Sequence, residues 1–155
     1  MRGRAKATRA PNKTMEKSVG KRDRVTALCD ALPQSEHLMR GDHVTYRVRG
    51  KVFAYFLDDH HGDGIVSVCV KSARGENVDR VRLFPERFYL PDYIGPRGWF
   101  GMRVDRGRVA WGEVADILEQ SYRLTAPTTC IAKLDGVQGG LDNRRRPPKA
   151  ARSRG

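Results

Sequence analysis

Basic side chains at residues 47, 49 and 51 of this chain are followed by aromatic ones at 53 and 55, and basic residues recur at 71 and from 97 to 108. Guanidinium and ammonium groups bind phosphate, and aromatic rings stack on bases. This combination is typical of a nucleic-acid-binding surface. The candidate residues on one sheet face are Arg47, Arg49, Lys51 and Lys71. The candidates for a second basic wing are Arg97, Trp99, Arg103, Arg106 and Arg108.

A second group of reactive side chains occupies residues 58–63, which read Asp-Asp-His-His-Gly-Asp. Carboxylates and imidazoles bind zinc or iron. Here, however, they follow one another in a single loop, without the spacing that lets ligands converge. Polar loops of this composition commonly connect two strands. We therefore predict no metal site and no cofactor.

Residues for catalysis are not combined in a recognisable way. His37 and His43 flank Asp42, but a general base needs a nucleophile within reach. Glu113 and Asp116 fall on the outer side of a predicted helix, where carboxylates are usually solvated. The chain has no phosphate-binding P-loop, no GxGxxG and no HExxH. We therefore expect a protein without catalytic activity.

The net charge of +12 is concentrated in the two ends of the 155-residue chain. Residues 1–24 carry +7 and residues 135–155 carry +4, whereas residues 25–134 carry only +1. Both ends are poor in large apolar residues, so they cannot bury enough surface to offset chain entropy. We predict disordered basic tails at residues 1–22 and 135–155, around one folded domain at residues 23–134.

Basic tails bind polyanions by releasing condensed counterions, which gives affinity without a choice of base sequence. The alternative is a solvated tail that only aids solubility. The candidate phosphate contacts of the C-terminal tail are Arg144, Arg145, Arg146 and Lys149.

Three widely separated cysteines, Cys29, Cys69 and Cys130, suggest a reducing environment. Their odd number and the lack of a CxxC motif favour free thiols, and thus a cytoplasmic protein. No apolar run approaches the roughly 20 residues of a membrane span. We expect no membrane partner.

Hydrophobic periodicity predicts the elements that must position these residues. Apolar residues at helical spacing alternate with period-two runs, in the order helix, three strands, helix, strand, helix. Asp23 is the expected cap of the first helix, and Gly50 is the expected turn between the first two strands. The predicted elements cover residues 23–32, 44–48, 51–57, 65–71, 76–84, 98–104 and 114–122. This order is typical of an α+β domain with helices on one face of an antiparallel sheet.

The alternation in the second strand assigns its residues to the two faces of the sheet. Val52, Ala54 and Phe56 would face the helices, and Phe53 and Tyr55 would join the basic side chains on the opposite face. A shift of one residue in register exchanges the faces and makes Phe53 a core residue. Both possibilities remain open at this stage.

Four short motifs together resemble the MmcQ/YjbR family. They are GKVFA at 50–54, SVCVK at 67–71, YIGPRGW at 93–99 and SYRLTAP at 121–127. The resemblance covers about residues 23–134. It implies a CyaY-like (frataxin-like) fold and a double-wing DNA-binding motif without a defined target. The basic tails are additions to that pattern.

Our first hypothesis is a non-catalytic DNA-binding protein that uses basic hairpin wings and basic tails for phosphate contact. The alternative is a protein- or small-ligand-binding module, because residues 25–134 are almost neutral. In that case the tails would give only nonspecific affinity for polyanions. A third hypothesis is an enzyme or metal handler that uses residues 58–63.

Overall fold

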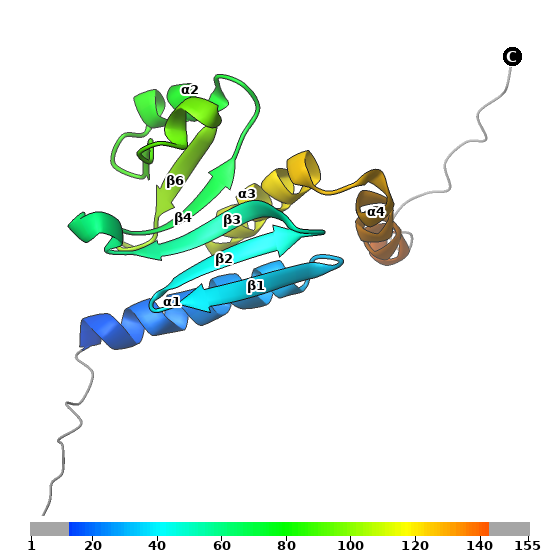
Figure 1. The fold of residues 1–155 in the computed structure, drawn as a ribbon, viewed down its shortest axis with the longest axis horizontal. Coiled ribbons are helices and arrows are strands. Elements are labelled where there is room, and N and C mark those ends of the chain that lie inside the picture. Colours follow the sequence, from blue (N-terminus) through cyan, green and yellow to red (C-terminus); the bar gives the residue numbers. More distant parts are fainter. Residues whose placement is uncertain (1–12, 143–155) are drawn as a thin grey trace, which may run out of the picture.

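The computed structural model describes residues 13–142 of the chain, and the side chains of residues 20–136. This part of the chain contains four α-helices and six strands (Figure 1). Their bounds are α1 (Lys13–Asp30), β1 (Ser35–Arg40), β2 (His43–Val48), β3 (Lys51–Asp58), β4 (Val66–Lys71), α2 (Glu76–Leu83), β5 (Phe88–Tyr89), β6 (Trp99–Arg103), α3 (Trp111–Thr125) and α4 (Thr128–Asp142). Two short 3-10 turns, η1 (His60–Gly62) and η2 (Gly95–Arg97), lie between strands.

The strands form one antiparallel sheet in the order β1-β2-β3-β4-β6-β5. Helix α1 packs along β1 and β2, and α3 packs against β3 and β4 (Figure 1). Helix α2 lies beside β5 and β6. These contacts confirm the predicted α+β fold, with an antiparallel sheet and helices packed on one of its faces. No helix within residues 13–142 is both long and apolar enough to cross a membrane.

The main core lies between the sheet and the helices α1 and α3. Large side chains fill it completely, and among them Tyr46, Phe53 and Tyr122 are fully buried. The rings of Phe53 and Tyr122 meet nearly at right angles, with their centroids 5.5 Å apart. This edge-to-face geometry is favoured for aromatic pairs. The Tyr122 hydroxyl donates to the Pro33 carbonyl at 2.6 Å, which connects α3 to the segment that follows α1.

A β-bulge in β3 decides which side chains reach this core. Tyr46 pairs with Ala54 but Arg47 pairs with Val52, so Phe53 is an extra residue without a partner in β2. A bulge of this kind reverses the alternation on one side of it. Phe53 therefore enters the core, which decides between the two faces that the sequence left open for it. Val52 takes the outer face instead and packs near Trp99.

The hydroxyl of Ser121 on α3 satisfies the backbone at this irregular point. It donates to the Phe53 carbonyl at 2.5 Å and accepts from the Lys71 amide at 2.9 Å. Ser121 is fully buried, so water cannot replace these bonds. One hydroxyl thus ties the bulge in β3 and the end of β4 to α3.

The first helix is longer than predicted. It begins at Lys13, ten residues before Asp23, so the expected cap at Asp23 lies inside the helix. The extension is polar, and periodicity of apolar residues could not reveal it. Two contacts hold the helix to the rest of the domain on either side of Asp23. The Lys21 ammonium donates to the Val104 carbonyl, and the Arg24 guanidinium lies 4.5 Å from the centre of the Trp111 ring.

Three further elements were not predicted. Strand β1 is an exposed edge strand without apolar alternation, and β5 has only two residues. Helix α4 follows directly after Pro127 and buries Cys130 and Leu134. It continues to Asp142, past the expected domain end at residue 134. The tail segments 1–12 and 143–155, with Arg144, Arg145, Arg146 and Lys149, lie outside the described residues.

We predict that Ser121→Ala lowers the free energy of unfolding by about 2–4 kcal/mol, because it leaves two buried backbone groups without a partner. Ser35→Ala is the matched control. The Ser35 hydroxyl is also buried, yet it has no hydrogen-bond partner among the described residues, so its removal should change stability by less than about 0.5 kcal/mol. Urea unfolding of the full chain measures both. Equal losses would contradict the bridging role of Ser121.

Candidate functional site

The antiparallel register divides the predicted basic residues between the two ends of the sheet. Lys51 begins β3, and Lys71 at the end of β4 pairs with Trp99 at the start of β6. Arg103 ends β6, so it lies at the opposite end with the residues that follow it. At about 3.3 Å per residue, β6 separates these ends by about 13 Å. The predicted second basic wing, residues 97–108, is therefore divided between the two ends, and the basic residues form two clusters.

The first cluster surrounds the β2–β3 turn. Arg49 occupies this turn with φ of 51°, and its guanidinium donates to the Gln34 side chain at 3.3 Å. The Lys71 ammonium lies 5.7 Å from the centre of the Trp99 ring, and partial burial together with the charge of Lys51 lowers the pKa of Lys71. Arg97 is exposed in η2.

Trp99 belongs to this end of the sheet but is only 6% exposed. Its ring packs against Tyr55, with 5.3 Å between the centroids, and joins a small cluster that includes Leu57 and Cys69. The indole therefore fills the outer face of the sheet and offers little of its surface to a base.

Two of the predicted arginines already hold carboxylates. Arg47 forms an ion pair with Glu36 at 3.1 Å. Arg103 binds Asp105 through two hydrogen bonds of 3.0 and 2.8 Å. Burial alone would raise the pKa of Asp105, but these bonds and the charge of Arg103 lower it below its usual value. Asp105 is therefore ionised at neutral pH, and the charge of Arg103 compensates its negative charge.

The second cluster lines an open groove of about 770 Å³ between α1 and the loop that joins β6 to α3. We call it the basic groove. Its lining residues are Gly20, Lys21, Arg24, Asp105, Gly107, Arg108, Val109 and Trp111. Arg106 is exposed beside it in the same loop. Since Arg103 neutralises Asp105, the charge left in the groove is positive.

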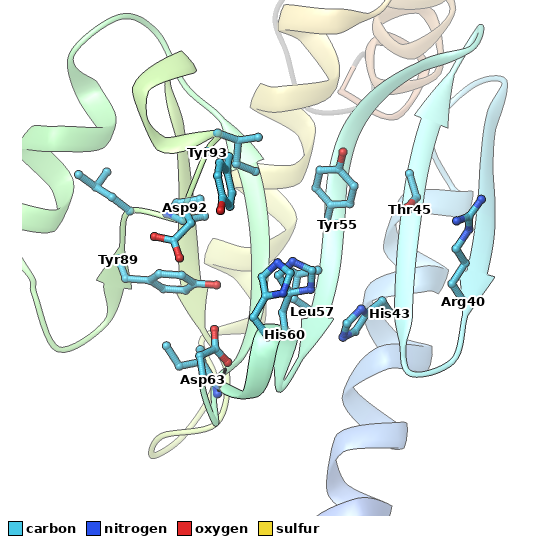
Figure 2. A pocket seen from close by; sticks show the side chains of 15 residues that line it. Arg40, His43, Thr45, Tyr55, Leu57, His60, Asp63, Tyr89, Asp92 and Tyr93 are labelled. Atoms are coloured by element: carbon cyan, nitrogen blue, oxygen red, sulfur yellow. Dashed lines mark hydrogen bonds between the residues drawn. The ribbon is translucent and has the colours of Figure 1, made fainter.

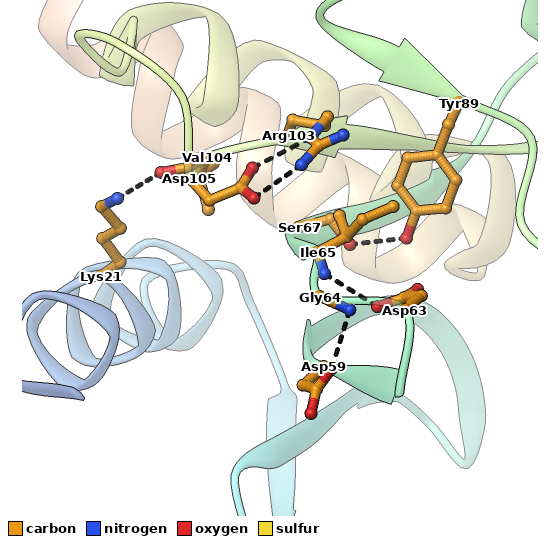
Figure 3. A network of polar contacts seen from close by, with 10 residues as sticks. All are labelled: Lys21, Asp59, Asp63, Gly64, Ile65, Ser67, Tyr89, Arg103, Val104 and Asp105. Carbon is orange, nitrogen blue, oxygen red and sulfur yellow. Dashed lines mark hydrogen bonds and ion pairs between the residues drawn. The ribbon is translucent and has the colours of Figure 1, made fainter. Parts of the chain in front are cut away.

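Several separate polar contacts lie at this end of the sheet (Figure 3). The Lys21 ammonium donates to the Val104 carbonyl. On either side of Val104, Arg103 at the end of β6 donates to Asp105 in the loop that follows. Nearby, the hydroxyls of Ser67 and Tyr89 lie 2.7 Å apart. Figure 3 shows that α1, β4, β5 and β6 meet here.

A separate cavity of about 590 Å³ opens on the sheet face opposite α1 and α3. We call it the outer-face cavity. Figure 2 shows Tyr89, Asp92 and Tyr93 on one side of it, Tyr55 and Leu57 in the middle, and His43, Thr45 and Arg40 on the other side. Its lining residues are Arg40, His43, Thr45, Tyr55, Leu57, His60, His61, Asp63, Ile65, Tyr89, Leu90, Pro91, Asp92, Tyr93 and Ile94.

The width of this cavity depends on Gly101 in β6. A Cβ atom at that position would come 2.3 Å from the Tyr89 ring, which is closer than real atoms approach. Gly101 therefore lets Tyr89 lie flat across β6, where its hydroxyl reaches Ser67. The ring forms the cavity wall on the β5 side.

The imidazoles of the cavity rim lie close together. The His43 and His60 ring centroids are 5.0 Å apart, and those of His60 and His61 are 3.9 Å apart. His43 Nε2 donates to the Asp58 carbonyl at 2.9 Å. The pKa of His60 is lowered below its usual value of 6.5. Burial is the main cause, and the charges of His61 and His43 contribute less.

The residues considered for catalysis or metal binding do not form a recognisable site within the described part of the chain. Within residues 20–136, no three His, Cys, Asp or Glu side chains are grouped as metal ligands would be. His37 contacts Asp30 at 2.9 Å, whereas His43 contacts the Asp58 carbonyl. Glu113 is paired with Arg87. Asp116 is exposed.

The three thiols are free and buried. Burial raises the pKa of Cys69 to about 11 and that of Cys29 well above its usual value, so neither is a thiolate at neutral pH.

Sequence reasoning missed the outer-face cavity and two residues of the basic groove, Lys21 and Arg24. The cavity is lined by residues of β1, β2, β3, β5 and two loops. These segments are separated in the sequence, so no local sequence pattern predicts that they lie together. Lys21 and Arg24 did carry a signal, because their spacing of three places them on one helix face. The assignment of residues 1–22 to a tail concealed it.

Comparisons with known proteins support the fold. A family model described as YjbR matches residues 30–124, more than half of the chain. The chain is also similar to the crystal structure of Deinococcus radiodurans protein DR2400, described as a DUF419 domain, with 18% identity and a TM-score of 0.53. That likeness covers 66% of this chain and 75% of the other, and it concerns the fold alone. No curated protein matches the chain.

We predict that His60 titrates below 6.5, and that His61→Asn moves its midpoint only part of the way back. The variant removes the second cause of the lowered pKa but not burial, which is the first. Because the unfolded chain would bind a proton more readily at His60, protonation there disfavours the folded state as pH falls through about 6.5. NMR titration of the imidazole resonances measures the midpoints. A wild-type midpoint at or above 6.5 would contradict this arrangement.

Proposed function

This chain belongs to the YjbR family, and we propose that it is a non-catalytic DNA-binding protein that contacts phosphates through the basic groove, the β2–β3 turn and its basic ends. The family resemblance suggests the type of ligand. The distribution of charge suggests where the contacts are made.

The observation that carries the proposal is the uncompensated charge of the basic groove. Lys21, Arg24 and Arg108 line it, and the single carboxylate among the lining residues, Asp105, is held by Arg103. Arg24 is also fixed in place by its contact with Trp111. A DNA backbone placed along the groove would meet positioned cations without meeting a free anion.

The groove is also continuous with the most basic part of the sequence. Its lining residues Gly20, Lys21 and Arg24 belong to residues 1–24, which carry a charge of +7. Contacts from that segment would add affinity and salt dependence but no choice of sequence. Any preference among sequences would have to come from exposed side chains of the two clusters, such as Arg97, Arg106 and Arg108.

The proposal includes a reducing, cytoplasmic location and the absence of a catalytic step. The free, buried cysteines support a reducing location. The absence of a catalytic step is supported by the different partners of His37, His43 and Glu113, which do not contact one another.

We predict that replacing Arg106 and Arg108 together by Gln weakens binding of the full chain to a labelled DNA duplex. Each lost phosphate contact should reduce the slope of log affinity against log salt concentration by about 0.9. The double variant should therefore reduce it by about one to two. Fluorescence anisotropy across a salt series measures the slope.

Arg74→Gln with Arg82→Gln is the matched control, because it removes the same charge from exposed positions outside both clusters. We expect this variant to keep most of the wild-type slope. Equal losses in the two double variants would show that net charge alone explains binding. No binding by the wild-type chain at low salt would overturn the proposed function.

A further inference from the structure

We propose that the outer-face cavity binds a small, flat aromatic molecule that carries an acidic group. The cavity lies on the sheet face opposite the main core and is separate from the basic groove (Figure 2). The inference therefore goes beyond DNA binding and does not depend on it.

The size and walls of the cavity suit a small aromatic molecule. Its volume of about 590 Å³ falls within the range of about 300–1,000 Å³ that is typical of ligand pockets. Three tyrosines, Tyr55, Tyr89 and Tyr93, stand around it (Figure 2). Leu57 and Ile94 add aliphatic surface between them. A flat ring is the shape that can pack against several aromatic faces at once.

The walls are also built on firm supports. Tyr55 packs against the buried Trp99, and Tyr89 is held over Gly101 by its contact with Ser67. Tyr93 has φ of 68°, which is unusual for an aromatic residue, and it remains 85% exposed at the rim. Strained backbone of this kind clusters at binding sites. The two inner tyrosines are thus preorganised, and Tyr93 is accessible to a ligand.

Arg40 suggests an acidic group on the side of the β1–β2 hairpin, where it lies with His43 (Figure 2). The Arg40 side chain makes no hydrogen bond or ion pair within the part of the chain that the structure describes. Its guanidinium is therefore available for a carboxylate or phosphate, which it can bind through two parallel hydrogen bonds.

The two carboxylates among the lining residues keep their negative charge but lie away from Arg40, on the Tyr89 side of the cavity (Figure 2). Asp63 accepts a hydrogen bond from the Ile65 amide at 2.9 Å. Asp92 belongs to the loop after β5 and lies on the opposite side of the cavity from Arg40 (Figure 2). An acidic ligand could approach Arg40 with its aromatic part turned toward the tyrosines.

Two sources share this chemistry, namely a free aromatic carboxylic acid and a mononucleotide with its base and phosphate. Indole-3-acetate represents the first and adenosine monophosphate the second. NMR chemical-shift titration of the full chain with each probe distinguishes them. We expect at least one probe to shift the resonances of Tyr55, Leu57 and Ile94 in a saturable manner.

Two variants test how the probe is held. Arg40→Gln should weaken binding of the acidic probe by about tenfold, because a hydrogen-bonded charge is lost. It should leave the weaker binding of the uncharged indole-3-ethanol within about twofold. Tyr93→Ala should weaken both indoles several-fold, and because Tyr93 is exposed the fold should not depend on it. Arg82→Gln, which replaces an exposed arginine of α2 outside the lining of the cavity, is the control and should change neither.

The proposal fails if neither acidic probe shifts the cavity resonances at millimolar concentration. It also fails if Arg40→Gln weakens the acid and the alcohol equally, because the acidic group would then not be read by Arg40. Binding of adenosine monophosphate alone assigns the cavity to nucleotides, and binding of indole-3-acetate alone assigns it to aromatic acids. DNA affinity in the absence of probe is not expected to change in the Tyr93→Ala variant, so failure here and failure of DNA binding can be told apart.

Discussion

The extra residue in β3 is the constraint on which the rest of the structure depends. Because Phe53 is an unpaired extra residue, the register of β3 against β2 shifts by one at this point. Phe53 and Ala54 therefore both face the helices, and Val52 and Tyr55 lie on the other face of the sheet. The backbone disturbance is acceptable because Ser121 on α3 binds the Phe53 carbonyl and the Lys71 amide. The core and the outer-face cavity therefore share one local irregularity.

Much of the fold could be predicted because the relevant signals are local. The period-two runs that became β2, β3, β4 and β6 lie within one or two residues of their predicted bounds, and the helical spacing that became α2 and α3 was equally clear. Strand β1 was not predicted because it is an edge strand whose side chains are almost all exposed, so it has no apolar alternation. The bulge was not predicted because Val52 and Phe53 are both apolar, and either could have faced the core. Only the pairing with Arg47 decides between them.

The functional residues were harder to predict for a related reason. A list of basic residues contains no information on which end of a strand each one occupies, or on which of them already hold carboxylates. Arg47 and Arg103 are paired, Trp99 is buried, and the remaining residues separate into two clusters. The basic groove brings Lys21 and Arg24 of α1 beside Arg108 of a distant loop. Lys21 belongs to the polar part of α1 that precedes its apolar residues, so the periodicity of apolar residues did not reveal it.

The close approach of Tyr89 to Gly101 has a consequence for how related chains can diverge. Any side chain at position 101 would occupy the space of the Tyr89 ring, since even a Cβ atom would come within 2.3 Å of it. A relative with a larger residue there cannot keep a tyrosine at position 89 in the same place. These two positions should therefore covary in an alignment, and the pair would mark which members of the family retain this cavity wall.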